Sequence, residues 1–188
     1  MKIGITGGIG SGKTYVANFL KKKGFPVYSC DDRARIIMKE DEAVKAELIK
    51  LIGEDAYLED GNLNKPVIAK YLYETKEHQE QIGTLVHPRV RTDFEMWCNF
   101  QDSEVVFMES AILYESGLAD AVDKVLYVYA AEEVRVRRII QRDKITRNEA
   151  HARIKAQMPE AVKMKLADYC IINNGNNNIL KQLQNIQI

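Results

Sequence analysis

The sequence of 188 residues lacks the segments that mark a secreted or membrane protein. No stretch approaches 18 consecutive apolar residues, which argues against a membrane-spanning helix. The chain opens without a charged region followed by a long apolar core, so we expect no signal peptide. Its three cysteines, Cys30, Cys98 and Cys170, form no C-x-x-C pair, which argues against a disulfide framework or a zinc knuckle. These absences predict a cytoplasmic protein with buried free thiols.

An excess of basic charge is also missing. Lysine plus arginine total 27 and aspartate plus glutamate total 27, so no basic field argues for a nucleic-acid partner. The apolar fraction of 46% and the charged fraction of 29% are ordinary for a soluble protein. The length suits one globular unit with a small inserted subdomain. We expect small-molecule partners, no nucleic acid and no membrane, and a monomer or weak homo-oligomer.

Residues 7–14 read Gly-Gly-Ile-Gly-Ser-Gly-Lys-Thr, which matches the phosphate-binding pattern G-x-x-x-x-G-K-[ST]. Glycine lets the backbone lie close to an anion, and the helix that follows directs its positive end at the same place. Lys13 supplies a point charge at the β- and γ-phosphates, and the Thr14 hydroxyl is a ligand for Mg²⁺. The motif therefore predicts a bound nucleoside triphosphate.

Short apolar runs alternate with helical patterns, which is typical of a doubly wound parallel α/β sheet. We predict about five strands, at residues 3–6, 26–29, 105–108, 125–128 and 169–172. Between residues 32 and 102 the pattern is mostly helical, and Pro88 is expected to bend or break the helix predicted at 78–100. The resulting domain prediction is a nucleotide-binding core at 1–40 and 102–188 and a helical acceptor-binding insertion at 41–101.

Among proteins that bind a triphosphate, the remaining motifs favour a small-molecule kinase. A guanine-nucleotide switch needs Asn-Lys-x-Asp, and the nearest match, residues 64–67, ends in Val67. A motor or transporter ATPase carries an apolar run that ends in aspartate, whereas the run at 105–109 ends in Glu109, whose place in a metal shell stays open. Asp31 and Asp32 follow the second predicted strand at the ligand-binding edge of the sheet. One of them can accept a proton from an acceptor hydroxyl, or either can cap the next helix.

Five arginines lie between residues 135 and 147. A charge run on a helix is usually a solvated face, and we expect this of Arg135 and Arg137. Arg138 and Arg142 are four residues apart and share a helix face. Polar segments with arginines are typical of a lid that closes over phosphates and excludes water. We predict a short lid at 141–152, with Arg142 at the phosphates and Arg138 and Arg147 as further candidates.

Several further segments follow the order and spacing of one family. They are 6–14, Pro26-Val-Tyr-Ser-Cys-Asp31-Asp-Arg-Ala-Arg35, His87-Pro88, Ile112-Leu-Tyr-Glu115, Arg138…Arg142-Asp143, Arg153…Gln157, Ala167-Asp168 and Ile171…Asn173-Asn-Gly175. From end to end the chain resembles the dephospho-coenzyme A kinases. It departs from the family's usual residues at Ser29 (aspartate), Lys65 (arginine), Ala111 (proline) and Arg135 (glutamine). A bidentate contact at position 65 would be weakened by lysine.

This resemblance implies a P-loop kinase fold and transfer of the ATP γ-phosphoryl group to the 3′-hydroxyl of dephospho-coenzyme A, with ATP and Mg²⁺ bound. It implies that Lys13, Asp31 and Arg142 are catalytic, with Asp31 at the acceptor hydroxyl, and that Thr14 holds the metal ion. The implied ATP contacts are Gly8, Gly10, Ser11, Gly12, Lys13, Thr14, Tyr15, Arg138, Arg142 and Asn173. The implied acceptor contacts are Asp31, Lys65, His87 and Glu115.

Three alternatives stay open at this point. His87 has an equally good interpretation as a satisfied structural histidine beside Pro88. A nucleoside or nucleoside monophosphate kinase of the same architecture would carry the same core. A nucleotide-gated binding module without transfer chemistry would share the phosphate loop but not the need for Asp31.

Overall fold

The computed structural model describes residues 1–186 and divides into two compact units. The sheet unit comprises Met1–Tyr28 and the chain from Phe100 onward, and the helical unit comprises Ser29–Asn99. The helical unit therefore begins earlier than the expected boundary at 41. The reason is that α2 (Cys30–Glu40) contacts α3 (Glu42–Ile52) and α5 (Lys76–Asn99). Residues 187 and 188 of the predicted core lie outside the described residues.

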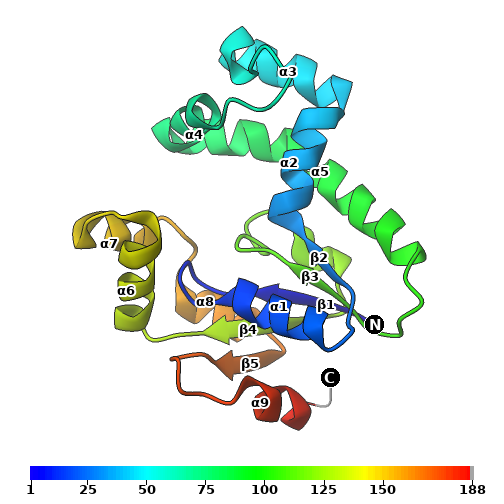
Figure 1. The fold of residues 1–188 in the computed structure, drawn as a ribbon, viewed down its shortest axis with the longest axis vertical. Helices are drawn as coiled ribbons and strands as arrows, with labels where there is room; N and C mark the ends of the chain where they lie inside the picture. The colour runs from blue at the N-terminus through cyan, green and yellow to red at the C-terminus, as the bar shows by residue number, and fades with distance from the viewer. Residues whose placement is uncertain (187–188) are drawn as a thin grey trace. The chain divides into compact units, whose positions relative to one another are not determined.

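The sheet unit is built on five strands, in the order β2-β3-β1-β4-β5 (Figure 1). Their bounds are β1 (Lys2–Thr6), β2 (Val27–Ser29), β3 (Val106–Glu109), β4 (Lys124–Tyr129) and β5 (Tyr169–Ile172). The central strand β1 pairs in parallel with β3 and β4, and β4 pairs in parallel with β5. All five predicted strands and the doubly wound parallel sheet are confirmed, because buried parallel strands read as continuous apolar runs.

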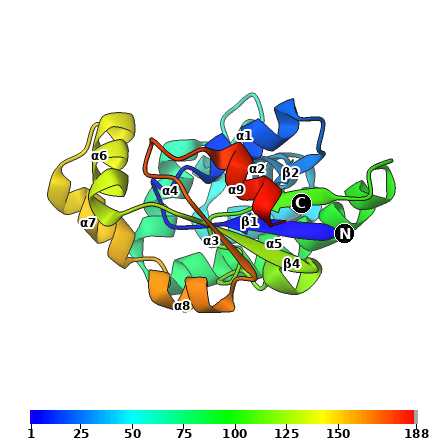
Figure 2. The same cartoon turned by 90° about the horizontal axis from the view of Figure 1, so that it is seen from below.

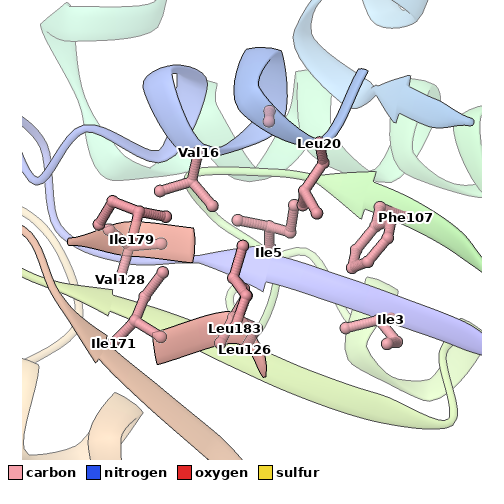
Figure 3. Packing of buried hydrophobic residues seen from close by; sticks show 11 residues of the cluster. Ile3, Ile5, Val16, Leu20, Phe107, Leu126, Val128, Ile171, Ile179 and Leu183 are labelled. Atoms are coloured by element: carbon pink, nitrogen blue, oxygen red, sulfur yellow. The ribbon is translucent and has the colours of Figure 1, made fainter. Parts of the chain in front are cut away.

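Helices cover both faces of this sheet. The helices of this unit are α1 (Lys13–Lys22), α6 (Glu132–Asp143), α7 (Arg147–Lys155), α8 (Glu160–Leu166) and α9 (Ile179–Asn185), with the short 3₁₀ helix η2 (Leu118–Ala121). On one face α1 and α9 place Val16, Leu20, Ile179 and Leu183 against the apolar side chains of the strands (Figure 3). On the other face α8 contacts β4 (Figure 2). This two-sided burial provides the rigid base for the loop that joins β1 to α1.

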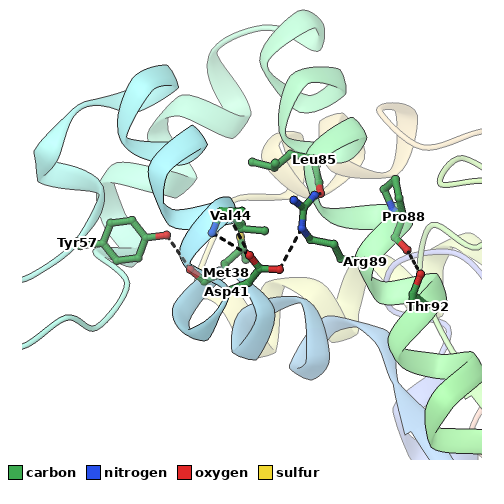
Figure 4. A network of polar contacts seen from close by, with 9 residues as sticks. Met38, Asp41, Val44, Tyr57, Leu85, Pro88, Arg89 and Thr92 are labelled. Carbon is green, nitrogen blue, oxygen red and sulfur yellow. Dashed lines mark hydrogen bonds and ion pairs between the residues drawn. The ribbon is translucent and has the colours of Figure 1, made fainter.

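The helical unit has its own apolar core. It contains α2, α3, α5, the 3₁₀ helix η1 (Glu54–Ala56) and α4 (Lys65–Glu74). Asp41 caps α3 by accepting hydrogen bonds from the amides of Ala43 and Val44 at 3.0 and 3.1 Å, and it pairs with Arg89 of α5 at 3.1 Å (Figure 4). These bonds lower the pKa of Asp41, with the Val44 amide as the largest cause. The Asp41 carboxylate thus joins α3 to α5.

Pro88 does not end its helix, since α5 runs unbroken from Lys76 to Asn99. Of the expected bend or break at Pro88, the break is therefore wrong. Proline removes one amide donor from the helix interior. Two side-chain bonds to carbonyls lie within α5 around this position: Arg89 Nη1 donates to the Leu85 carbonyl at 2.8 Å, and Thr92 Oγ1 donates to the Pro88 carbonyl at 3.2 Å (Figure 4).

Among the three cysteines of the described residues, which form no disulfide, only Cys30 is buried. Cys98 is partly buried, and Cys170 is exposed. The expectation of a buried thiol at Cys170 is wrong because β5 is an outer strand, on which Ile171 faces the core and Cys170 alternates to the opposite side. In residues 1–186 no helix has the length and apolar character needed to cross a membrane.

Candidate active site

The loop between β1 and α1 has the backbone of a phosphate-binding site. Gly10 and Gly12 have φ angles of 79° and 90°, in the left-handed region that favours glycine. The Ser11 amide donates to the Gly8 carbonyl at 3.0 Å, which closes the turn. Gly12 is the N-cap of α1 and offers no side-chain hydrogen bond. The first-turn amides of the helix therefore have no capping side chain, and such a terminus attracts anions.

A pocket of about 180 Å³ lies at this loop. It is lined by Gly10, Gly12, Lys13, Thr14, Arg138 and Arg142. Three of these side chains are cationic and none is a carboxylate, so the pocket suits a polyanion. The structure thus brings together Lys13, Thr14, Arg138 and Arg142, which the sequence assigned to the phosphates from separate segments.

Two side chains hold the loop by its carbonyl groups. Arg138 Nη1 donates to the carbonyls of Gly10 and Ser11, both at 3.2 Å, and Asn173 Nδ2 donates to the Ser11 carbonyl at 2.9 Å. Burial lowers the pKa of Arg138, with a smaller contribution from Arg137. A Cβ atom on Gly12 would lie 2.2 Å from Asn173 Nδ2, so glycine is required here for space as well as for φ. Asn173 contacts the loop backbone and does not line the pocket.

Arg142 is held in place by its neighbour. Its Nε and Nη2 atoms donate to the two oxygens of Asp143 at 2.6 and 3.0 Å. Arg153 Nη1 donates to the same carboxylate at 2.6 Å. These bonds, led by that from Arg142, lower the pKa of Asp143. The carboxylate is therefore a shared acceptor that fixes one pocket arginine and one arginine of α7.

The segment predicted as a lid, 141–152, is mostly helical. Arg142 and Asp143 lie in the last turn of α6, and a capping box of Thr146 and Glu149 begins α7 at once. Only residues 144–146 link the two helices. Arg147 pairs with the exposed Glu133 and does not line the phosphate pocket. The capping pair Thr-x-x-Glu at 146–149 was the signal in the sequence.

Arg135 corrects the interpretation of the arginine run. Arg137 is exposed as expected, but Arg135 is buried and pairs with Glu160 through Nη2 and Oε2 at 2.7 Å. Helical spacing was the available signal, since Arg135 lies four residues before the buried Ile139. Its backbone and side chain lie against Gly8 and Gly10 of the loop.

Two oxygen groups meet beside the pocket. Thr14 Oγ1 donates to Glu109 Oε1 at 3.4 Å, and Glu109 is buried at the end of β3. A hydroxyl and a carboxylate are oxygen ligands of the kind that Mg²⁺ prefers. The donor set therefore fits a magnesium ion that accompanies bound phosphates.

In the helical unit the two adjacent aspartates have different surroundings. Ser29, and neither aspartate, is the N-cap of α2, and its hydroxyl accepts from the Asp32 amide at 3.4 Å. Asp32 pairs with Arg35 at 3.0 Å. Asp31 is exposed in the first turn of α2, and within residues 1–186 its carboxylate has no hydrogen bond or ion pair. Asp31 is thus the carboxylate that is available to an acceptor.

The other residues assigned to the acceptor differ in their contacts. Lys65 is exposed at the start of α4. His87 is partly buried over Gly83, where an added Cβ would lie 2.9 Å from His87 Cε1, and burial lowers the pKa of His87. Glu115 in the sheet unit pairs with Lys163 at 2.5 Å and accepts from the Met158 amide at 3.3 Å. Lys163 is buried, a position that sequence reasoning missed.

Solved structures with this fold include P-loop kinases. Shikimate kinase from Bacteroides thetaiotaomicron superposes with a TM-score of 0.57 at 17% identity, covering 100% of this chain and 96% of the other. At that identity the likeness concerns the fold alone. Together with the phosphate loop and its cationic pocket, it places the chain in the P-loop kinase class.

More specific matches cover most of the chain. The family model described as Dephospho-CoA kinase matches residues 1–178. The dephospho-CoA kinase of Bacteroides fragilis is 40% identical over 184 residues, which are 97% of this chain and 89% of that protein. The Campylobacter jejuni dephospho-CoA kinase structure has a TM-score of 0.69 at 25% identity, covering 100% of this chain and 96% of that one. The chain belongs to the dephospho-CoA kinase family.

Proposed function

We propose that this chain transfers the γ-phosphoryl group of ATP to the 3′-hydroxyl of dephospho-CoA, giving CoA and ADP. One observation carries the proposal: the cation-lined pocket is built on the phosphate loop of a chain that matches this family over residues 1–178. The deoxyadenosine kinase of M. mycoides has a TM-score of 0.51 at 15% identity, so it shares the fold alone. The alternative of a nucleoside or nucleotide kinase is therefore not favoured.

The phosphates bind at the amides of the loop and the first turn of α1. Lys13 and Arg142 neutralise the charge that develops as the phosphoryl group moves, which is the main task in this chemistry. Asp143 uses the Nε–H and one Nη2–H of Arg142. An arginine has five N–H donors, so both Nη1 donors stay available to a phosphate. Asp143 thus orients Arg142 and leaves N–H donors of its guanidinium available to a phosphate.

Mg²⁺ accompanies the nucleotide in this proposal, held by Thr14 with Glu109 beside it. When bound, the ion would offset the negative charge of the phosphates. The 3.4 Å contact between Thr14 Oγ1 and Glu109 Oε1 supports the assignment, because the carboxylate orients the hydroxyl. In this proposal Glu109 would accept a hydrogen bond from Thr14 and so orient its hydroxyl oxygen.

The acceptor hydroxyl donates a hydrogen bond to Asp31, which orients it and takes its proton as the new bond forms. Support comes from the contrast between the paired Asp32 and the unpaired Asp31. The helical unit would hold the rest of the acceptor, with Lys65 and a neutral His87 as proposed contacts. Glu115 would reach the acceptor only by giving up its ion pair with Lys163. Closure of the α6–α7 segment would exclude water. We place this activity in the cytoplasm, in a monomer or weak homo-oligomer.

A panel of acceptors tests the proposal. Purified protein is mixed with ATP and Mg²⁺, and ADP release is measured with dephospho-CoA, nucleosides, nucleoside monophosphates and shikimate. We expect release with dephospho-CoA far above the other acceptors, and none from the Lys13→Ala variant. Preferred turnover of a nucleoside or nucleotide would reject the proposal in favour of the alternative kinase. ATP binding without turnover of any acceptor would identify a binding module.

A further inference from the structure

The phosphate loop lies against a charged side chain, Arg135, that does not line the phosphate pocket. A Cβ atom on Gly8 would lie 2.1 Å from Arg135 Nη1, and one on Gly10 would lie 2.8 Å from the Arg135 carbonyl oxygen. The Arg135 side chain is only 6% exposed. Residues 8–10 therefore rest directly on Arg135, with no room for any side chain between them.

Arg135 is buried with one side of its guanidinium in an ion pair and its Nε without a hydrogen bond in the described residues. Its Nη2 pairs with Glu160 at the first turn of α8, while its Nε is buried with no hydrogen-bond partner in residues 1–186. Burial raises the pKa of Glu160, Arg135 opposes that effect, and Glu132 adds to it. A buried ion pair with an unsatisfied donor is weak evidence for stability, because desolvation offsets the attraction. The position of the pair under the loop suggests a different use.

A second contact reaches the same part of the loop from the same side. The Ile9 amide donates to Gln157 Oε1 at 2.7 Å, in the link between α7 and α8. Neither Ile9 nor Gln157 lines the phosphate pocket. Gln157 and Glu160 are three residues apart, so one short segment fixes both the amide of the loop and the guanidinium beneath it.

We propose that Arg135 is a positioning residue for nucleotide binding. With Gln157 and Glu160 it forms a loop support that holds residues 8–10 in the phosphate-accepting conformation before ATP arrives. The inference rests on the proposed function in one respect, namely that this loop binds a nucleoside triphosphate. A loop ordered in advance loses less conformational entropy on binding, so the support acts on affinity for ATP. It does not act on the phosphoryl transfer step, because Arg135 does not line the phosphate pocket.

The test separates an effect on ATP affinity from an effect on folding stability. Arg135→Gln and Glu160→Gln each leave a buried group without its partner, so both single variants are expected to lower the melting temperature. The double variant R135Q/E160Q removes both charges and is expected to recover most of that loss. Mg·ATP affinity is measured by isothermal titration calorimetry without acceptor, and kcat with dephospho-CoA at saturating ATP. Arg137→Gln removes one exposed charge from the same helix and is the matched control.

We expect the double variant to bind Mg·ATP about tenfold more weakly than the wild type, with kcat within about twofold. Arg137→Gln is expected to match the wild type in both measurements, and Arg135→Lys, which keeps the cation, to bind ATP more tightly than Arg135→Gln. A double variant with wild-type stability and wild-type ATP affinity would overturn the inference, as would a loss confined to kcat. If the double variant folds poorly, the inference is tested instead by comparing the ATP affinities of Arg135→Lys and Arg135→Gln. Failure of dephospho-CoA as an acceptor for the wild type would reject the proposed function and leave this comparison intact.

Discussion

Replacing Asp143 by asparagine changes the hydrogen bonds that orient Arg142 and leaves Arg142 itself in the chain. In the wild type the carboxylate receives two hydrogen bonds from Arg142 and one from Arg153. Asparagine has nearly the same shape but only one acceptor oxygen and no charge. Asp143→Asn therefore removes the bidentate pairing that orients Arg142 at the edge of the phosphate pocket.

The expected loss follows from these contacts. A hydrogen bond between charged groups contributes about 1.5–3 kcal/mol, which corresponds to about 10- to 150-fold in rate if it is lost from the transition state. Solvent screens the pair, since 62% of the Arg142 side chain is exposed, so we expect the lower end of that range. Because Arg142 acts on charge that develops during transfer, the loss belongs mainly to kcat, about tenfold.

Steady-state kinetics with ATP and dephospho-CoA measure this loss, and thermal unfolding checks that the variant is folded. Glu133→Gln is the matched control, because it breaks an exposed ion pair with Arg147 outside the phosphate pocket. We expect the control to keep wild-type kcat. A folded Asp143→Asn variant with kcat within twofold of the wild type would refute the idea that Asp143 positions Arg142.

Three further predictions concern other parts of the chain. Asp31→Asn is expected to lower kcat by about 100-fold or more, with ATP binding retained. Asp32→Asn, at the carboxylate paired with Arg35, is expected to change kcat less than about fivefold. Equal losses of kcat in the two variants would contradict the assignment. Gly12→Ala is expected to abolish ATP binding in calorimetry, because it adds a clash with Asn173 to the backbone strain. The control Gly24→Ala, at the same φ of 90° but with open space around it, is expected to keep ATP binding. The pKa of Asp168 lies below 3.8, chiefly through its hydrogen bond from Lys124, so its stabilising effect is present above about pH 4 and is lost as the pH falls through the lowered pKa. Urea unfolding at several pH values is expected to show the wild type converging on Asp168→Asn in acid, and a constant difference between them would count against this pairing.

The sheet and the phosphate loop were predictable because their signals are local. Strands covered on both faces must be apolar along their whole length, and the loop needs glycine at Gly10 and Gly12 for their left-handed backbone. The cationic pocket could be predicted in part, since Arg138 and Arg142 lie one helical turn apart. The site roles assigned to individual residues stay predictions.

Other features depend on contacts between distant segments, which a single sequence does not display. The charge run predicts a solvated Arg135, whereas the spacing to Ile139 places this residue on the buried stripe of α6. The ion pair that accompanies its burial is with Glu160, which lies 25 residues further along the chain. The buried Lys163 was missed for the same reason, since its partner is Glu115. Side chains of Arg89 and Thr92 bond to carbonyls around Pro88 in the unbroken α5, and the proline rule does not include them. For Arg135 and Lys163, a partner distant in the sequence changed the outcome of a local rule.

A single-turnover experiment with γ-³²P-labelled ATP and an equimolar mixture of dephospho-CoA and nucleoside monophosphates tests the central claim most directly. The account predicts that the label appears on the 3′-oxygen of the dephospho-CoA ribose, and that the Lys13→Ala variant transfers none. Label found on a nucleotide, on another hydroxyl of dephospho-CoA, or only in inorganic phosphate would contradict it.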